Sequence, residues 1–293
     1  MGVPWTGHPA WPVVERLSEA TGRDVAALLT EADAESLRAT RNSQLAAFAL
    51  SLVILYAARS GGLEYVPLAA VAGHSLGEYT ALVAAEAIPA EAAARLVAAR
   101  GEAMQAAADA QPGTMAAVLG LDPELVRQAC EGVDGAWPAN DNAPGQVVIA
   151  GTPEGVEKAG AAAKDLGAKR VMPLPVGGAF HSPLMTPAQQ QLDAALRAAH
   201  FHSSTADVVA NVDAASHRQG FADLLSRQLV SPVRWRESLL TLGGLGVTHF
   251  LELGPGTELS GMVKRTVDGA VRANVATPED LEPLMAFLES ERG

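Results

Sequence analysis

The sequence predicts an α/β fold in which a smaller subdomain is inserted into a large domain built on a mainly parallel sheet. Short apolar runs alternate with helical patterns along most of the 293 residues, which is the order of a sheet covered by helices on both faces. Hydrophobic residues make up 48% of the chain but aromatic residues only 4%. The core must therefore be built from Ala, Val and Leu, which suits helices packed closely on such a sheet.

The first part of the large domain, residues 1–112, is predicted to be mostly helical. Apolar residues recur with helical spacing before the single predicted strand, and Gln111-Pro112-Gly113 stops the last helix. The predicted elements are helices at 12–32 and 33–60, a strand at 68–71, and helices at 78–86 and 89–110.

Residues 113–175 follow a different order, strand-helix-strand-strand-helix-strand, which is typical of a ferredoxin-like fold. We therefore predict a small ferredoxin-like subdomain at 113–175, inserted between the two parts of the large domain, 1–112 and 176–293. Its predicted elements are strands at 115–119, 136–139, 146–150 and 169–174, and helices at 123–130 and 153–166.

The second part of the large domain returns to alternating strands and helices, which indicates that its strands join the parallel sheet. A Gly254-Pro255-Gly256 turn precedes the last predicted helix. The other predicted elements are helices at 187–199, 222–229 and from 236, and strands at 207–211 and 248–253.

Composition excludes several classes of function. The net charge of −12 argues against nucleic acid as a partner, because phosphate neutralisation needs a basic face. The single cysteine, Cys130, cannot form an internal disulfide, and the histidines lack metal-ligand spacing. The first residues given lack the basic and then apolar pattern of a signal peptide, and no uninterrupted apolar run reaches about 18 residues. We therefore predict a cytoplasmic protein with no metal, nucleic-acid partner or membrane partner.

The strongest motif is Gly73-His74-Ser75-Leu76-Gly77, which follows the predicted strand and precedes a predicted helix. This context is typical of a nucleophile elbow, a tight turn that holds a serine hydroxyl out from a hydrolase-like sheet. The glycines leave room for strand and helix to cross closely. Leu76 lies at the start of the predicted helix, and its backbone N–H is the predicted oxyanion donor.

A serine hydroxyl needs a base within hydrogen-bond reach. His74 is adjacent to Ser75 in sequence, and side chains of consecutive residues in a turn diverge. His181 lies in a glycine-containing loop after a predicted strand, where active-site loops of α/β folds gather. We therefore predict His181 as the base.

Taken together, these residues resemble a known family. Five motifs occur in the order found in malonyl-CoA:acyl carrier protein transacylases and the related acyltransferase domains of polyketide synthases. They are the elbow with its following Glu78-Tyr79, the Arg-Gly-x-x-Met run at Arg100–Met104, Pro144–Gly151, Gly178–Met185 and Glu252–Gly256.

The resemblance implies roles for individual residues. Ser75 would be acylated, and His181 would be its general base, oriented by backbone carbonyls and not by an acidic residue. Arg100 would pair with the free carboxylate of a malonyl group, a contact that suits a planar guanidinium. Further substrate-binding residues by resemblance are Gln228, Gln44, Phe180 and an asparagine that is either Asn140 or Asn142.

The implied chemistry is ping-pong acyl transfer. The serine attacks the thioester of malonyl-CoA, and the phosphopantetheine thiol of an acyl carrier protein then takes the malonyl group. No cofactor is expected on the chain itself. Two alternatives remain: a serine thioesterase that uses the same Ser75 and His181 with water, and a catalytically weak carrier-binding homologue. Arg100 discriminates between the transferase and the thioesterase, because a lipase-like pocket is apolar.

The start of the chain departs from the family pattern. Family members begin with a strand and a Gly-Gln-Gly-Ser-Gln type loop that supplies a second oxyanion donor, whereas this chain opens at Met1-Gly2-Val3-Pro4-Trp5. A start codon assigned too far downstream, a shortened chain and a genuine truncation each account for the difference. A genuine loss of one oxyanion donor would lower the rate roughly 10²- to 10³-fold.

Overall fold

The N-terminal region folds into three helices and not into the two long ones that the periodicity predicts. The computed structural model describes residues 1–290, and the side chains of residues 1–288. Gly22 ends the first helix with a φ of 65°, and the Asp24 side chain caps the second by accepting from the Ala27 N–H. The helices are α1 (Val13–Thr21), α2 (Val25–Thr30) and α3 (Thr40–Ser60), with short 3-10 turns η1 (Val3–Trp5) and η2 (Ser36–Arg38).

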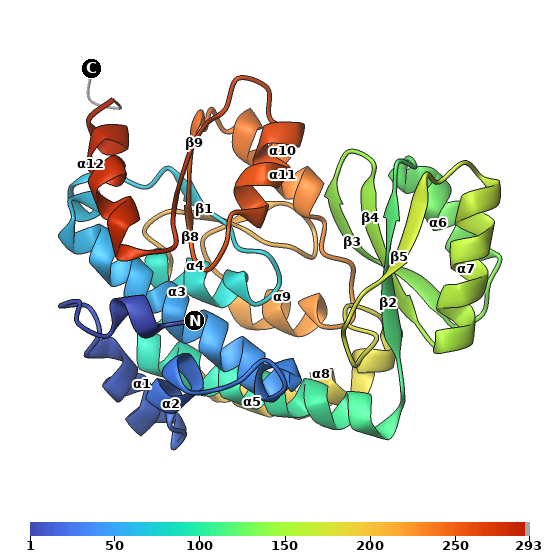
Figure 1. Cartoon of the computed structure of the whole chain (residues 1–293), viewed down its shortest axis with the longest axis horizontal. Helices are drawn as coiled ribbons and strands as arrows, with labels where there is room; N and C mark the ends of the chain where they lie inside the picture. Colours follow the sequence, from blue (N-terminus) through green and yellow to red (C-terminus); the bar gives the residue numbers. More distant parts are fainter. Residues whose placement is uncertain (291–293) are drawn as a thin grey trace.

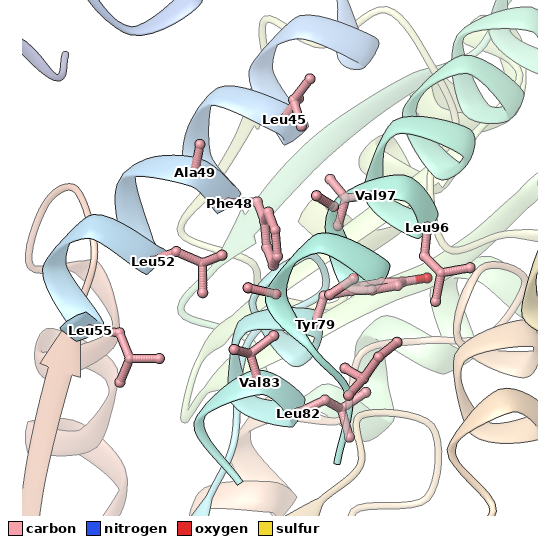
Figure 2. Close-up of a cluster of buried hydrophobic side chains, with 14 of the residues drawn as sticks. Leu45, Phe48, Ala49, Leu52, Leu55, Tyr79, Leu82, Val83, Leu96 and Val97 are labelled. Atoms are coloured by element: carbon pink, nitrogen blue, oxygen red, sulfur yellow. The ribbon is translucent and has the colours of Figure 1, made fainter. Parts of the chain in front are cut away.

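The main core lies between α3, α4 (Gly77–Ala84) and α5 (Ala90–Ala110). Phe48, Tyr79 and Val97 come from these three helices and point toward one another in Figure 2. Helix α3 is long and apolar enough to cross a membrane by composition, yet 67% of its apolar window is buried inside the protein. Its apolar character is thus that of a core helix.

A four-stranded antiparallel sheet forms a distinct layer beside the rest of the molecule, with α6 and α7 packed on it (Figure 1). The strand order is β3-β4-β2-β5. Its elements are β2 (Thr114–Leu119), α6 (Pro123–Glu131), β3 (Ala136–Ala143), β4 (Gln146–Gly151), α7 (Pro153–Asp165) and β5 (Arg170–Pro173). The predicted order of elements is confirmed. Strand β3 is longer than predicted because two irregularities carry its polar second half alongside β4.

The remaining strands do not form the single parallel sheet that the sequence predicts. Strands β1 (Ala70–Val71) and β6 (Asp207–Val209) pair in parallel, and β7 (Ser216–His217) adds antiparallel to β6. Strands β8 (His249–Leu253) and β9 (Val271–Val275) make a separate parallel pair. A largely apolar cleft of about 670 Å³ lies between β1 and β8. The mixed α/β class is confirmed, but the extent of the parallel sheet is smaller than predicted.

The last part of the chain also holds more elements than predicted. The helix after the Gly-Pro-Gly turn, α11 (Glu258–Thr266), is followed by β9 and a further helix, α12 (Leu281–Ser290). Strand β9 was not predicted, because its sequence, VRANV, is too short and too polar to show the alternation of apolar residues typical of a strand. The other elements are η3 (Leu63–Tyr65), η4 (Pro183–Met185), α8 (Thr186–Ala198), α9 (Phe221–Gln228), α10 (Trp235–Gly244) and η5 (Pro278–Asp280).

Strand β3 is also joined to the loop before α10. The Asp141 N–H donates to the Val233 carbonyl at 2.9 Å, and the Val233 N–H donates to the Ala139 carbonyl at 2.8 Å. The Arg236 guanidinium makes two-pronged contacts of 2.7–3.0 Å with the Asp141 carboxylate. These contacts hold the polar half of β3 against the elements that carry the site.

Candidate active site

The serine lies on a strained turn directly after β1. A Cβ placed on Gly73 would lie 2.0 Å from the Gly77 carbonyl, so strand and helix cross too closely for any other residue there. A Cβ on Gly77 would meet nothing within 4 Å, so the predicted need for a small residue holds at Gly73 only. Ser75 has a φ of 51°, a left-handed conformation that is strained for a non-glycine residue.

The side chain of Asn211, which follows β6, hydrogen-bonds to the backbone of this turn. Its side-chain oxygen accepts from the Ser75 N–H at 2.7 Å, and its NH₂ group donates to the Gly73 carbonyl at 2.8 Å. The side chain is fully buried. The sequence analysis did not identify Asn211, although a polar residue directly after a buried apolar strand is the signal that indicates it. Asn211 thus fixes the backbone on both sides of His74.

His181 and Ser75 lie within direct hydrogen-bond distance. The Ser75 hydroxyl and His181 Nε2 are 2.7 Å apart, and His181 Nδ1 lies 2.9 Å from the Gln228 carbonyl. A carbonyl only accepts, so Nδ1 carries the proton and Nε2 is free to accept from the serine. Burial, and then the nearby Arg100 charge, lower the pKa of His181 to about 3. The imidazole is therefore neutral, as a base must be.

The His74 ring makes its contacts with residues other than Ser75 and His181. Its Nε2 lies 2.8 Å from the Asn142 side-chain oxygen, and its ring stands edge-on to Trp235 with centroids 5.5 Å apart. Burial lowers the pKa of His74 as well. The side chains of His74 and Ser75 therefore have different partners, as expected for consecutive residues in a turn.

Arg100 is a buried cation whose partners are neutral. Only 1% of it is exposed. Its Nη2 donates to the Ser75 hydroxyl at 2.9 Å and to Gln228 Oε1 at 3.1 Å, and its Nη1 donates to Gln44 Oε1. Among the residues that the structure describes, no carboxylate lies within ion-pair distance of it. A planar guanidinium with neutral partners keeps the charge and the geometry that suit a two-pronged contact with a carboxylate.

The other predicted site residues divide into two groups. Asn140 and Phe180 line, with Gln44, the cleft of about 640 Å³ that contains Ser75 and His181. The Asn140 side-chain oxygen is buried and has no hydrogen-bond partner among the described atoms. Asn142 is not on that cleft, because its side chain is turned to His74. Of the two asparagines, the geometry thus favours Asn140 for substrate contact.

Leu76 precedes the first residue of α4 and is its N-cap. The first N–H groups of a helix have no partner inside the helix and point along its positive end. This position suits an oxyanion formed at Ser75.

A second residue that the sequence analysis did not identify is Glu78, which is only 2% exposed. Its Oε2 accepts from Gln228 Nε2 at 2.8 Å and from the Asn211 N–H at 3.1 Å. Burial raises the pKa of Glu78 to about 7, against the opposing effects of these hydrogen bonds and of Arg100. The pair Glu78-Tyr79, which directly follows the elbow, was the sequence signal that could have identified Glu78.

This raised pKa predicts a stability effect. Between its ordinary value of 4.5 and about 7, Glu78 is protonated in the folded protein and ionised in the unfolded chain. The free energy of unfolding therefore falls as pH rises through that window, by about 3 kcal/mol for this one group. Urea unfolding of wild type and Glu78→Gln at several pH values should show the variant gaining relative stability toward pH ~8. Parallel pH curves for the two proteins would contradict this assignment.

A metal site is not evident in the part of the chain that the structure describes: no three His, Cys, Asp or Glu side chains gather as metal ligands there.

Comparisons with known proteins agree with this geometry. The acyl transferase domain family matches residues 10–284. The malonyl CoA-acyl carrier protein transacylase of Escherichia coli strain K12 is 44% identical over 268 residues, which cover 88% of this chain and 86% of the relative. The chain belongs to the malonyl-CoA:acyl carrier protein transacylase family.

Solved structures of this family have the same fold. The acyl-carrier-protein S-malonyltransferase of Burkholderia pseudomallei superposes with a TM-score of 0.89 at 40% identity, over 94% of this chain and 91% of that one. A malonyl-transacylase solved in complex with a type II polyketide-synthase acyl carrier protein has a TM-score of 0.89 at 38% identity, over 98% and 94%. The resemblance found in the five sequence motifs is thereby confirmed.

Proposed function

We propose that this chain is an [acyl-carrier-protein] S-malonyltransferase, which moves a malonyl group from CoA to the phosphopantetheine thiol of an acyl carrier protein. The observation that carries the proposal is the buried Arg100, whose guanidinium lies 2.9 Å from the Ser75 hydroxyl and lacks a direct counter-ion among the described residues. A malonyl group presents one carboxylate and one thioester, which match the guanidinium and the nucleophile. The family relationship supports the same reaction.

In the first half-reaction, Ser75 attacks the thioester carbonyl while His181 Nε2 takes the hydroxyl proton. The Gln228 carbonyl holds the imidazole in the required tautomer through Nδ1 and stabilises the imidazolium that forms. The Leu76 N–H stabilises the oxyanion. The imidazolium returns its proton to the departing CoA thiolate, which leaves a malonyl ester on Ser75.

In the second half-reaction, the carrier thiol attacks the serine ester. His181 takes the thiol proton and gives it to the serine oxygen as the ester breaks. Arg100 holds the malonyl carboxylate throughout, so the ester carbonyl stays in place for the second attack. Gln44 and Gln228 orient the guanidinium, and Asn140 and Phe180 face the acyl group or the pantetheine arm from the cleft wall.

We further propose that the architecture is a hydrolase-like domain, 1–112 and 176–293, with an inserted ferredoxin-like subdomain at 113–175. The strand order β3-β4-β2-β5 with two crossing helices supports the name of the inserted part. The protein is proposed to act in the cytoplasm, in fatty-acid or polyketide synthesis, with the phosphopantetheine carried by its partner and no cofactor of its own.

Intact-protein mass after brief incubation with malonyl-CoA tests the proposal. We expect one malonyl adduct, which moves to holo acyl carrier protein when the carrier is added. An adduct that water alone removes quickly would instead identify a thioesterase. A stable complex with carrier protein but no adduct would identify a carrier-binding protein without transferase activity.

A further inference from the structure

Glu78 is a buried carboxylate that the transfer mechanism does not use. Both of its hydrogen bonds come from neutral donors, the Asn211 N–H and the Gln228 amide. A glutamine side chain at this position could accept the same two bonds. Burying a charge costs more than burying an amide, so hydrogen bonding does not explain why a carboxylate is present.

The negative charge of Glu78 is explained by Arg100, which lies on the other side of Gln228. The Gln228 side chain donates to Glu78 through Nε2 and accepts from Arg100 through Oε1, so one amide separates the carboxylate from the guanidinium. Glu78 is also the carboxylate whose charge acts on Arg100. Above a pH of about 7, where Glu78 is ionised in the empty site, its charge compensates the buried cation, and on the side of Ser75 the guanidinium contacts only the neutral hydroxyl.

A malonyl carboxylate changes this balance. Once it contacts Arg100 directly, the buried site would hold two negative charges and one positive charge. Like charges in a low-dielectric site favour protonation of the group that gives up its charge most easily. Glu78 is that group, because its pKa of about 7 already lies near neutrality.

We propose that Glu78 sets the affinity of the site for the malonyl carboxylate: it is the counter-charge of Arg100 in the empty enzyme, and it takes one proton from solvent when that carboxylate binds. This inference rests on the proposed function. Charge balances in the step, since the site goes from Arg⁺ with Glu⁻ to Arg⁺ with malonyl⁻ and a neutral acid. The ionised carboxylate weakens malonyl binding, which eases release of the acyl unit.

The other titratable groups around Glu78 and the acyl site do not account for such an uptake. Arg100 stays charged and Tyr79, whose pKa burial raises, stays neutral. His181 and His74 have lowered pKa values and stay neutral in the empty site. Asp213 acts on Glu78 from the loop after β6, but its side chain is turned to His217.

Calorimetry on a Ser75→Ala background tests the proposal, because that variant binds thioesters without being acylated. Titrations with malonyl-CoA at about pH 7.5, in two buffers of different ionisation enthalpy, report the protons taken up on binding. We expect net uptake with malonyl-CoA but not with acetyl-CoA, which lacks the carboxylate. With Glu78→Gln added, the uptake should vanish and malonyl-CoA should bind roughly tenfold more tightly.

The matched control is Glu86→Gln, which removes an exposed carboxylate two residues after the end of the same helix and should leave both uptake and affinity unchanged. Equal proton uptake with both ligands, or weaker malonyl-CoA binding in Glu78→Gln, would overturn the proposal. If the Glu78→Gln protein does not fold, Ser75→Ala alone decides: its affinity for malonyl-CoA, relative to acetyl-CoA, should fall as pH rises through about 7. Identical pH dependence for the two ligands rejects the proposal.

The calorimetric results distinguish failure of the proposed function from failure of the role proposed for Glu78. Binding of acetyl-CoA but not malonyl-CoA by the Ser75→Ala protein would contradict the proposed function itself. Normal malonyl-CoA binding without proton uptake would contradict only the role of Glu78.

Discussion

Replacing Ser75 with alanine is expected to abolish the malonyl adduct, and replacing His181 with alanine to slow its formation roughly 10²- to 10⁴-fold. The serine oxygen is the atom that becomes acylated, so nothing replaces it. The histidine supplies proton transfer, and its Nε2 is 2.7 Å from that oxygen. Rapid-quench mass measurement of the acyl-enzyme separates the two effects.

The control for these variants is His200→Ala, which removes an exposed histidine after α8 and should acylate at the wild-type rate. The pH dependence adds a check. Because the pKa of His181 is lowered to about 3, acylation should not lose rate through protonation of this imidazole between pH ~6 and ~8. A serine variant that still acquires a stable malonyl adduct would show that another residue is the nucleophile.

Replacing Arg100 with alanine is expected to reverse the preference between charged and neutral acyl groups. Loss of the partner of a buried carboxylate costs about 3–5 kcal/mol, so kcat/KM for malonyl-CoA should fall roughly 10²- to 10⁴-fold. Acetyl-CoA makes no such contact, and its kcat/KM should change little. Acylation rates with both thioesters, measured side by side, give the ratio.

Two further substitutions make this result specific. Arg95→Ala removes an exposed arginine from the same helix and should leave the malonyl-to-acetyl ratio unchanged. Arg100→Lys keeps the charge but loses the planar fork that also contacts Gln44 and Gln228, so its ratio should lie between those of wild type and alanine. If Arg100→Ala retains malonyl selectivity, the carboxylate binds elsewhere.

The parts of the fold that the sequence predicted well are those with strong local signals. Helix α5 is confirmed to its last residue, because an alanine-rich run ends at Gln111-Pro112-Gly113. The order of elements from β2 to β5 is confirmed because proline and aspartate or threonine start each of its helices. The errors fall where such signals are weak, as in the two-residue strands β1 and β7 and in the polar half of β3.

The candidate site divides in the same way. Gly73, Ser75 and Leu76 form one local turn, and the sequence predicts their arrangement from spacing alone. The partners of that turn come from far along the chain: His181 is 106 residues from Ser75, and Asn211 is 136 residues away. The roles of Arg100, Gln44 and Gln228 were predicted through family resemblance, because each one read alone is an ordinary helix residue.

By itself, the sequence determined the nucleophile turn and most helix boundaries, since these depend on residues close together in the chain. Only the tertiary structure decided that Asn140 and not Asn142 lines the catalytic cleft. It also decided that Asn211 binds the backbone of the serine turn and that Glu78 in turn binds Asn211. Both outcomes depend on which side chains meet after distant strands and helices pack. Hydrogen bonding and burial at such meeting points follow from the whole fold, so a local pattern can point to a polar residue such as Asn211 but does not name its partners.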